Sequence, residues 1–502
     1  MRPYVVAVLL GAMMAVLVVT LAKRPKTDHV APGYVATTTA SAGDAGAGTG
    51  DARAGDALAG EAGDAKIEKT LRVASLGWDL LAPGVVQSEG ATPNDKTAFS
   101  REIEVYLTNT EQPVKIEAML ARGGDDPDGV DVAIVPLPVL VAAYERLRAL
   151  DPRMFLLVGW SHGREALVAP KDIDLAKLAG NDEAARQDVK LISQGNDAST
   201  MQALFAFELA SVPSSKVKLL PLPNEKEKSD KSVAGAFLAI DRGAQAQADA
   251  RKFLFTSADA SRLLPLVAVA PRGVIERRKA ALEAFARGWF EGMAKVRKDA
   301  PAAARRVAAV KGAPEAIALL ERLGQIEPAT LRDDTQAFAL SGRLAVNLGK
   351  LFTRCFQLWR GVGVLTVPPP DEPPLDTTVV AELARTDSSL ASAPGANKDV
   401  PPALPDPTVA AAPKATLLLT RRIEQVKGDK ADKIDGEAIA SELGFIAGVF
   451  EKATLRITVR GGLKGAKPIV IDARDRFSIA PGRLLVGDAQ LGSAVAIIEL
   501  YL

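Results

Sequence analysis

Apolar and polar positions in the first third of the chain predict a strand followed by a helix. Residues 130–135 form a short apolar run rich in β-branched side chains, which is typical of a buried strand. Pro136 and Pro138 end that run. Residues 137–150 then carry apolar side chains at helical spacing. The pattern therefore predicts one strand that passes directly into one helix.

The same stretch continues with two more extended segments. Residues 154–159 read as a second buried strand, and residues 166–168 resume the extended pattern after a polar break at 161–164. A strand, a helix and a strand of this length predict a parallel pair joined by a crossover helix. Ligands of open α/β sheets lie at the carboxyl ends of strands. We therefore expect a small molecule to be held near residues 136–138 and 160–163.

The rest of the chain repeats this alternation, which predicts a mixed α/β protein. Further strands are expected at residues 70–75, 103–107, 189–193, 217–220, 234–240, 252–256, 263–270, 416–420 and 455–459, with apolar runs also at 469–471 and 495–500. Helices are expected at residues 114–120, 172–178, 201–209, 275–296, 301–309, 313–323, 344–359, 375–384 and 436–450. The apolar stripe of the longest of these helices indicates a core face rather than a cofactor site.

An uncharged apolar segment at residues 4–22 precedes the globular pattern. About 20 apolar residues span the bilayer hydrocarbon as a helix. A cleavable signal peptide has a shorter apolar core and a small-residue cleavage site, and residues 20–22 are compatible with such a site. Basic residues flank the segment on both sides, so charge alone does not orient it. We expect an uncleaved anchor, with a cleaved signal as the alternative.

Composition divides the chain into five parts. Residues 1–26 hold the apolar anchor or signal segment, and residues 27–68, rich in Ala, Gly, Asp and Thr, form a linker without enough large apolar residues for a core. Residues 69–385 form the main globular part. Residues 386–414 are a second linker, rich in Pro, Ala and Ser, and residues 415–502 form a small C-terminal α/β module.

Composition and charge exclude several classes of function. The 502 residues include 62 Lys and Arg and 61 Asp and Glu, with a net charge of +1 and no basic block, so no nucleic-acid partner is expected. The two histidines, His29 and His162, cannot make a multi-His metal site. The single Cys355 excludes an intrachain disulfide and a cysteine zinc site, and its apolar neighbours predict a buried side chain. We expect no cofactor and no metal.

A candidate binding feature lies at the start of the helix that carries residues 201–209. Gly195, Asn196 and Asp197 follow a predicted strand, and Ser199 and Thr200 lie in the first helical turn. Free backbone N–H groups and hydroxyls at a helix N-terminus bind anions. The alternative is an ordinary capped helix on an α/β sheet.

Several stretches, taken in their order, resemble type II periplasmic solute-binding proteins of ABC importers. The resemblance is to the branch that includes sulfonate, nitrate and thiamine-precursor binding components. It covers roughly residues 69–384, and the stretches that carry it are LRVASLGWDLLAP (71–83), GVDVAIVPLP (129–138), FLLVGWSHGREALVAP (155–170), KDIDLAKLAG (171–180) and RRKAALEAFARGWFEGMAKV (277–296).

The resemblance implies a two-lobed, periplasmic-binding-protein-like clamshell that closes on a ligand by hinge motion. Carried over by position, the expected ligand-binding residues are Trp78, Asp79, Pro136, Ser161, His162, Gly195, Asn196, Ser199 and Thr200. Trp78 would stack or pack on the ligand, or else anchor the lobe surface. His162 would contact the ligand or be structural. No nucleophile-elbow sequence surrounds Ser161, so no catalytic residue is assigned.

A subgroup of this family has an N-terminal anchor and a C-terminal OmpA-like domain, and this chain is similar in layout. Residues 455–461 resemble the central strand of that domain, but the residues expected to grip peptidoglycan are not evident, so the module is interpreted as a degenerate OmpA-like domain that does not bind the wall. The resemblance implies an inner-membrane protein with one span and its bulk in the periplasm.

Two functions from different classes follow from this resemblance. The first is a membrane-anchored solute-binding protein that binds a small polar or anionic ligand and works with an ABC permease. The second is a cell-envelope scaffold that uses the same fold without a ligand, which the charged residues 224–231 favour. An enzyme is a more distant third, because only His162 and Cys355 offer the chemistry that enzymes related to this branch use.

Overall fold

The computed structural model describes residues 69–171, 173, 175, 188–222, 236–241, 251–341, 345–387, 406–424 and 435–502. Within these ranges no helix has the length and apolar character needed to cross a membrane. The predicted anchor, the first linker, most of the helix expected at 172–178 and most of the second linker lie outside the described residues, so they stay predictions.

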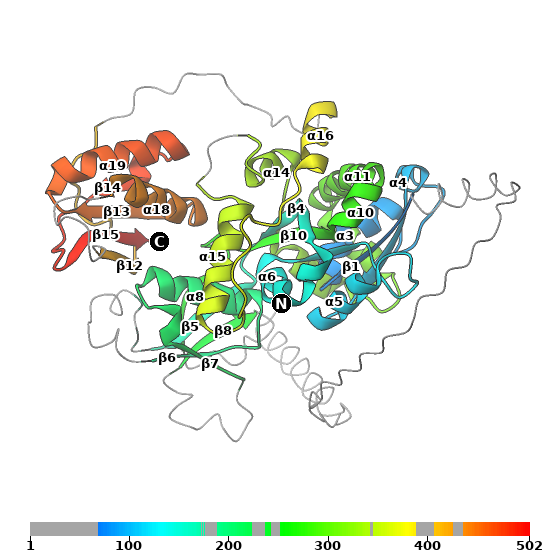
Figure 1. The fold of residues 1–502 in the computed structure, drawn as a ribbon, viewed down its shortest axis with the longest axis horizontal. Coiled ribbons are helices and arrows are strands. Elements are labelled where there is room, and N and C mark those ends of the chain that lie inside the picture. Colours follow the sequence, from blue (N-terminus) through cyan, green and yellow to red (C-terminus); the bar gives the residue numbers. More distant parts are fainter. Residues whose placement is uncertain are drawn as a thin grey trace, which may run out of the picture. The chain divides into compact units, whose positions relative to one another are not determined.

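A mixed six-stranded sheet forms the first lobe (Figure 1). Its order is β11-β4-β10-β3-β1-β2. The strands are β1 (Thr70–Ser75), β2 (Glu104–Asn109), β3 (Val132–Pro136), β4 (Pro152–Ser161), β10 (Pro265–Pro271) and β11 (Ile326–Pro328). Every residue of β3 except the last is buried, as expected for a strand covered on both faces.

The strands expected at residues 130–135 and 154–159 were predicted to pair in parallel, and the strand order corrects this prediction. β3 and β4 lie in one sheet and α6 (Leu137–Leu147) connects them, but β10 is inserted between them and is antiparallel to both. The inserted strand comes from residues more than a hundred positions later in the chain. Local periodicity carries no information about such a strand, because only the tertiary fold brings it back.

A mixed five-stranded sheet, in the order β7-β6-β8-β5-β9, forms the second lobe. Its strands are β5 (Glu165–Pro170), β6 (Val189–Ile192), β7 (Val217–Leu220), β8 (Phe237–Asp241) and β9 (Arg251–Thr256). β5 therefore lies in a different lobe from β4, although only three residues separate them. α8 (Ala198–Leu209) packs against β5 and β8 of this sheet.

Helices surround the two sheets. The remaining helices of the two-lobe part are α3 (Trp78–Ser88), α4 (Ala98–Glu102), α5 (Pro113–Arg122), α10 (Arg272–Arg277), α11 (Lys279–Lys298), α12 (Ala300–Ala308), α13 (Ala316–Leu323), α14 (Leu331–Ala337), α15 (Leu348–Gly361) and α16 (Thr378–Thr386), with 3-10 turns η1 (Arg148–Leu150) and η3 (Ser214–Lys216). The helix expected at 275–296 is interrupted at Arg278, which is buried and bonds Asp131, Asp125 and the carbonyl of Thr70.

The C-terminal module has a four-stranded sheet in the order β12-β15-β13-β14. Its elements are β12 (Leu417–Glu424), α18 (Gly436–Val449), β13 (Thr454–Val459), α19 (Gly462–Phe477), η6 (Pro481–Arg483), β14 (Leu484–Val486) and β15 (Ala494–Tyr501). The apolar run at 469–471 lies inside α19, where Ile469 and Val470 supply part of its buried face. Three residues are too few to separate a strand from a helix by pattern.

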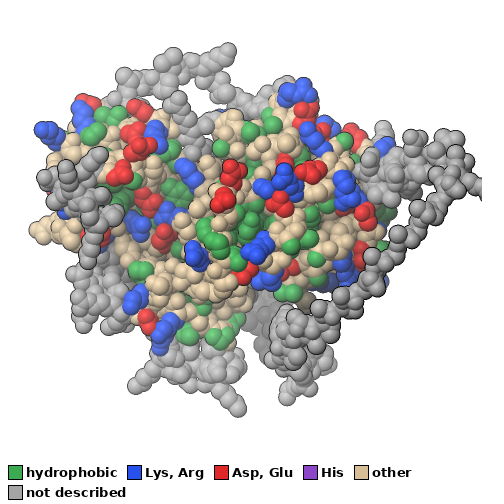
Figure 2. Space-filling view, viewed as in Figure 1, with side chains coloured by type: hydrophobic (Ala, Val, Ile, Leu, Met, Phe, Trp, Pro, Cys, Tyr) green, Lys and Arg blue, Asp and Glu red, His purple; other side chains and the backbone are tan. Residues whose placement is uncertain are grey.

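The fold class expected from the sequence is confirmed, with two α/β lobes and a smaller C-terminal α/β module. One continuous cluster of buried hydrophobic residues includes Phe155 of the first lobe, Phe205 of the second and Phe450 of the module. On the face shown in Figure 2, basic and acidic side chains are interspersed, in line with the near-neutral net charge of +1.

Candidate functional site

Two chain crossovers join the lobes and define the cleft between them. The first comprises residues 162–164, between β4 and β5, and the second comprises residues 257–264, between β9 and β10. They are tied together because the backbone N–H of Ser257 donates to the carbonyl of Glu165 at 2.9 Å. The N–H of Ser161 likewise donates to the carbonyl of Leu264 at 2.9 Å. This arrangement places the end of β4 and the start of β5 at the floor of the cleft.

A cavity of about 220 Å³ occupies the cleft and takes walls from both lobes. Its apolar walls come mainly from the first lobe, and its polar groups come from both lobes and the first crossover. The lining residues that carry the argument are Glu111, Ser161, Arg164, Glu165, Asp197 and Asp241. Concave sites with apolar walls and a few convergent polar groups are the usual form of small-molecule sites.

Arg164 reaches across the cleft and pairs with one carboxylate from each lobe. Its Nη1 lies 3.2 Å from Oδ2 of Asp79, which begins α3 in the first lobe, and its Nε lies 3.0 Å from Oδ2 of Asp241, at the end of β8 in the second. Burial alone would lower the pKa of Arg164, but Asp79 and Asp241 more than reverse this effect and raise the pKa. The guanidinium is therefore a fixed positive charge that bridges the lobes.

Glu165 lies beside Arg164 and is held inside the cleft. Its carboxylate accepts a hydrogen bond from Oγ of Ser161 at 2.5 Å, and its side chain is buried. Burial raises the pKa of Glu165, while the hydrogen bond from Ser161 and the charge of Arg164 oppose the rise. The cavity therefore contains an acid that ionises less readily than an exposed glutamate.

The N-terminus of α8 faces the same cavity, and several of its hydrogen-bond donors are occupied within the chain. Oδ1 of Asp197 accepts hydrogen bonds from the backbone N–H of Thr200 at 2.8 Å and from Oγ of Ser199 at 2.9 Å. Oγ1 of Thr200 donates to the carbonyl of Gly195 at 2.8 Å. The carboxylate of Asp197 thus holds the position at which an external anion would bind a helix terminus.

The structure brings together only some of the residues expected from the sequence. Pro136, Ser161 and Ser199 line the cavity. Asp79 does not line it but forms an ion pair with Arg164, which does. Trp78 instead lines a separate groove on the first lobe, together with Leu107, Asn109 and Arg306. Thr200 is buried behind the helix terminus, and the exposed Gly195 and Asn196 do not line the cavity.

His162 lies in the first crossover but outside the cavity lining. Its Nδ1 is 3.9 Å from Oε2 of Glu327, and its backbone N–H donates to the carbonyl of Gln325 at 2.8 Å. No hydroxyl lies in hydrogen-bond contact with the ring among the interactions of the described residues. The described residues therefore do not place a hydroxyl nucleophile where His162 could act as its general base.

Sequence reasoning missed the charged residues that shape this site. Glu111, Arg164, Glu165 and Asp241 all line the cavity, next to Asp197, which the sequence had already marked as a helix-cap candidate. A signal existed for three of them, because Arg164 lies in the polar break between two strands, Glu165 directly follows that break, and Asp241 ends a third strand. Within the described ranges, no group of three or more His, Cys, Asp or Glu side chains is arranged to hold a metal ion.

Comparison with known proteins gives similarity at the level of structure only. No family model matches the chain, and no curated protein matches it. It is similar to a sulfonate-binding protein from Methylobacillus flagellatus, at 13% identity over 63% of this chain and 94% of that chain, with a TM-score of 0.43. It is also similar to the aliphatic sulphonate-binding protein of Escherichia coli, at 15% identity over 52% and 84% of the two chains, with a TM-score of 0.38.

A third similar structure is the ligand-binding component of an ABC-type import system from Staphylococcus aureus, at 12% identity over 63% of this chain and 100% of that chain, with a TM-score of 0.40. All three of these proteins are described as ligand-binding components. The similarity of this chain to these three proteins is one of fold alone.

Proposed function

We propose that this chain is a membrane-anchored periplasmic solute-binding protein of an ABC-type importer, and that it binds a small polar ligand in the interlobe cleft. One observation carries the proposal. A 220 Å³ cavity lies where two α/β lobes meet at their crossovers, and it receives polar groups from both lobes. In a cleft that has lost its ligand, we would expect apolar side chains to fill the cavity. Here the apolar walls leave the cavity open.

The charges around the cavity favour a neutral or positively charged ligand over the anionic ligand that remained open from the sequence. Glu111, Asp197 and Asp241 contribute carboxylates, and Arg164, the one basic residue among the described lining residues, already pairs with Asp79 and Asp241. Opposite charges attract most strongly where water is partly excluded. A free anion would meet the carboxylates of Glu111, Asp197 and Asp241 in this cavity.

The proposal is tested by the small molecules that the protein retains on purification. The full-length chain is denatured, and the released low-mass compounds are measured by mass spectrometry. We expect a compound in the wild type that is absent from Ala198→Phe, because Ala198 lines the cavity and the larger ring would fill it. Ala280→Phe on the exposed face of α11 is the matched control and retains the compound. Equal retention by all three proteins would contradict binding in the cleft.

The anchored location rests on the apolar segment at residues 4–22. Deletion of residues 1–24 is expected to release the protein from the membrane fraction. Membrane association of the shortened protein would contradict a single anchor. The partner permease and the periplasmic placement of the bulk rest on the resemblance to importer components.

A second candidate function is a cell-envelope scaffold that works without a ligand. The bridge from Arg164 to Asp79 and Asp241 favours it, because a residue of the chain itself already links the two lobes in the way that a bound ligand would. If no compound is retained and no ligand binds, this function becomes the better account.

A further inference from the structure

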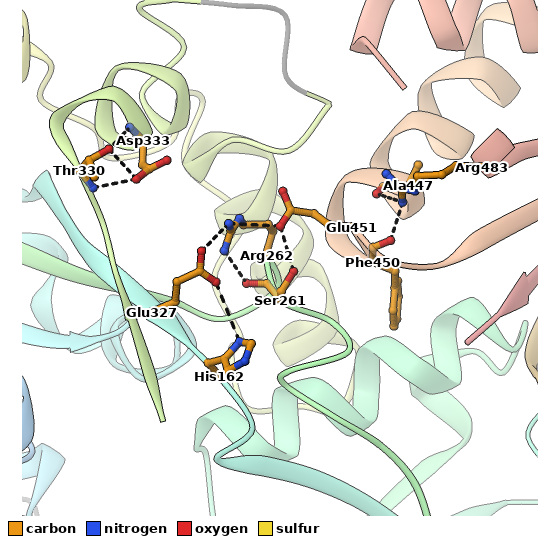
Figure 3. A network of polar contacts seen from close by, with 10 residues as sticks. All are labelled: His162, Ser261, Arg262, Glu327, Thr330, Asp333, Ala447, Phe450, Glu451 and Arg483. Carbon is orange, nitrogen blue, oxygen red and sulfur yellow. Dashed lines mark hydrogen bonds and ion pairs between the residues drawn. The ribbon is translucent and has the colours of Figure 1, made fainter. Parts of the chain in front are cut away.

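The second crossover is in direct contact with the C-terminal module (Figure 3). The backbone N–H of Arg262 donates to the carbonyl of Val449 at 3.2 Å. Oγ of Ser261 donates to Oε2 of Glu451 at 3.2 Å, and Nη2 of Arg262 lies 3.2 Å from the same oxygen. The end of α18 and the residues after it therefore hold the backbone of a hinge segment.

Arg262 joins this contact to the first lobe. Its Nη2 lies 2.7 Å from Oε1 of Glu327 in β11, and its guanidinium lies 5.4 Å from the ring centre of Trp160 in β4. Trp160 and Glu327 are cross-strand neighbours in the sheet. Figure 3 shows Arg262 between Glu327 on one side and Glu451 on the other. One side chain of the crossover thus bonds the first lobe and the module together.

The module is packed most closely on the second lobe. The ring of Phe450 lies 6.4 Å from Phe205 in α8 and 5.9 Å from Phe255 in β9, measured between centroids. The backbone N–H of Arg422 donates to Oγ of Ser211 at 2.9 Å, just beyond α8. Fully buried aromatic contacts of this kind contribute strongly to stability, so we expect the module to move with the second lobe.

α15 makes a third connection. Nη1 and Nη2 of Arg354 bond the carboxylate of Glu442 in α18 at 2.8 and 3.0 Å, and its Nε bonds Glu208 in α8 at 2.8 Å. On the same helix, Nε1 of Trp359 donates to the carbonyl of Pro138 in the first lobe at 3.0 Å. α15 therefore contacts both lobes and the module at once.

The side of the module that faces the first lobe is packed less tightly. A cavity of about 260 Å³ separates Trp160 and Gln336 of that lobe from Gly444, Ala447 and Phe477 of the module. On this side the polar contacts of Arg262 replace the continuous side-chain packing found on the second lobe. The restraint between the module and the first lobe is thus concentrated in a few identifiable bonds.

We infer that the C-terminal module is a brace on the hinge, which holds the second crossover and restrains the opening of the interlobe cleft. Hinge motion between lobes requires changes in the backbone angles of a few crossover residues. Val449 holds the backbone of Arg262, and Glu451 holds the side chains of Ser261 and Arg262, so these bonds oppose such changes at residues 261 and 262. This role is independent of the proposed function, since it holds whether or not the cleft has a ligand.

Distance measurements between the lobes test the brace. Nitroxide labels are placed on the full-length chain at Lys115→Cys in α5 and Ser215→Cys after α8, both exposed, and Cys355 is buried and stays unlabelled. Pulsed electron paramagnetic resonance then gives the distance distribution. We expect the double variant Glu451→Ala with Glu442→Ala to have a broader distribution than the parent, shifted to other distances.

The control is Glu437→Ala, because Glu437 lies in the same module but its ion pair is with Arg476 at 3.6 Å and its side chain is 81% exposed. We expect this control to match the parent. If the double variant fails to fold, a second variant, Glu451→Gln with Ser261→Ala, replaces it in the same measurement. It removes the charge of Glu451 and the hydroxyl of Ser261 with little change in side-chain volume. A folded variant of either kind with the parent distribution would overturn the inference.

Discussion

Nη1 of Arg164 lies 3.2 Å from Oδ2 of Asp79, and this contact joins a residue of the first crossover to a buried carboxylate of the first lobe. Asp79 is fully buried on its side chain, and its other oxygen, Oδ1, has no hydrogen-bond partner among the described residues. The negative charge of this buried carboxylate is therefore compensated by one guanidinium, that of Arg164.

Arg164→Met is expected to destabilise the folded protein. Removing one partner of a buried ion pair leaves the other charge uncompensated. Because the Arg164 side chain is 28% exposed, we expect the free energy of unfolding to fall by about 2–3 kcal/mol, less than for a fully buried pair. Urea unfolding of the full-length chain measures it. Adding Asp79→Asn should restore part of the loss. Arg122→Met, which breaks an exposed pair with Asp128, should change the stability by less than about 1 kcal/mol.

The raised pKa of Glu165 predicts a pH dependence with a definite sign. An acid whose folded-state pKa lies above its unfolded value binds more protons in the folded state, so its contribution to stability is fully present below the unfolded pKa of about 4.5 and is lost as the pH rises through the folded pKa. Glu165→Gln removes this dependence. The stability of the wild type relative to Glu165→Gln should therefore fall as the pH rises above about 4.5, and a constant difference between pH 4 and 8 would contradict the assignment.

Asp197→Asn separates the charge of the cavity from the cap of α8. Asparagine caps helices about as well as aspartate, so we expect a stability change of less than about 0.5 kcal/mol. Removal of the carboxylate should weaken the binding of positively charged compounds and strengthen that of anions, measured by calorimetry. Asp435→Asn, at the N-cap of α18 and away from the cavity, is the matched control and should change neither affinity.

A disulfide between the module and the segment before α15 tests how they are placed. A Cβ built on Gly448 would lie 3.5 Å from the Cβ of Val346, within the range that a disulfide requires. Gly448→Cys with Val346→Cys is expected to oxidise readily, as shown by loss of free thiols on the denatured protein. Gly436→Cys with Val346→Cys should stay reduced, because Gly436 faces Ile469 instead. If both cysteine pairs stayed reduced, the module would not occupy the observed position.

Much of the secondary structure could be predicted from the sequence, because local periodicity determines it. The strand expected at 70–75 agrees with β1, and the one at 217–220 with β7. The break of the long helix at Arg278 was not predictable, since its partner Asp131 lies more than a hundred residues earlier. The order of the strands was not predictable for the same reason, as the insertion of β10 shows.

The candidate site was predicted less well than the fold. Of the residues expected at the site, Pro136 and Ser161 at strand ends and Ser199 at a helix N-terminus line the cavity. The charges that determine its chemistry, Arg164 and Asp241, are brought together from segments 77 residues apart. The sequence left open whether the α8 terminus is a capped helix or an anion site, because an Asp at that position is compatible with both, and the structure shows the cap.

The most direct test of the central claim is thermal unfolding of the full-length chain against a panel of small alkylammonium compounds, neutral amino acids, sulfonates, nitrate and phosphate. A ligand at about 100 times its Kd stabilises the native state by about 2.7 kcal/mol, which should raise the Tm by a few degrees. We predict a rise with neutral or positively charged compounds that is lost in Ala198→Phe. No rise with any compound would contradict a ligand-binding cleft, and a rise with anions alone would contradict the charge preference proposed for it.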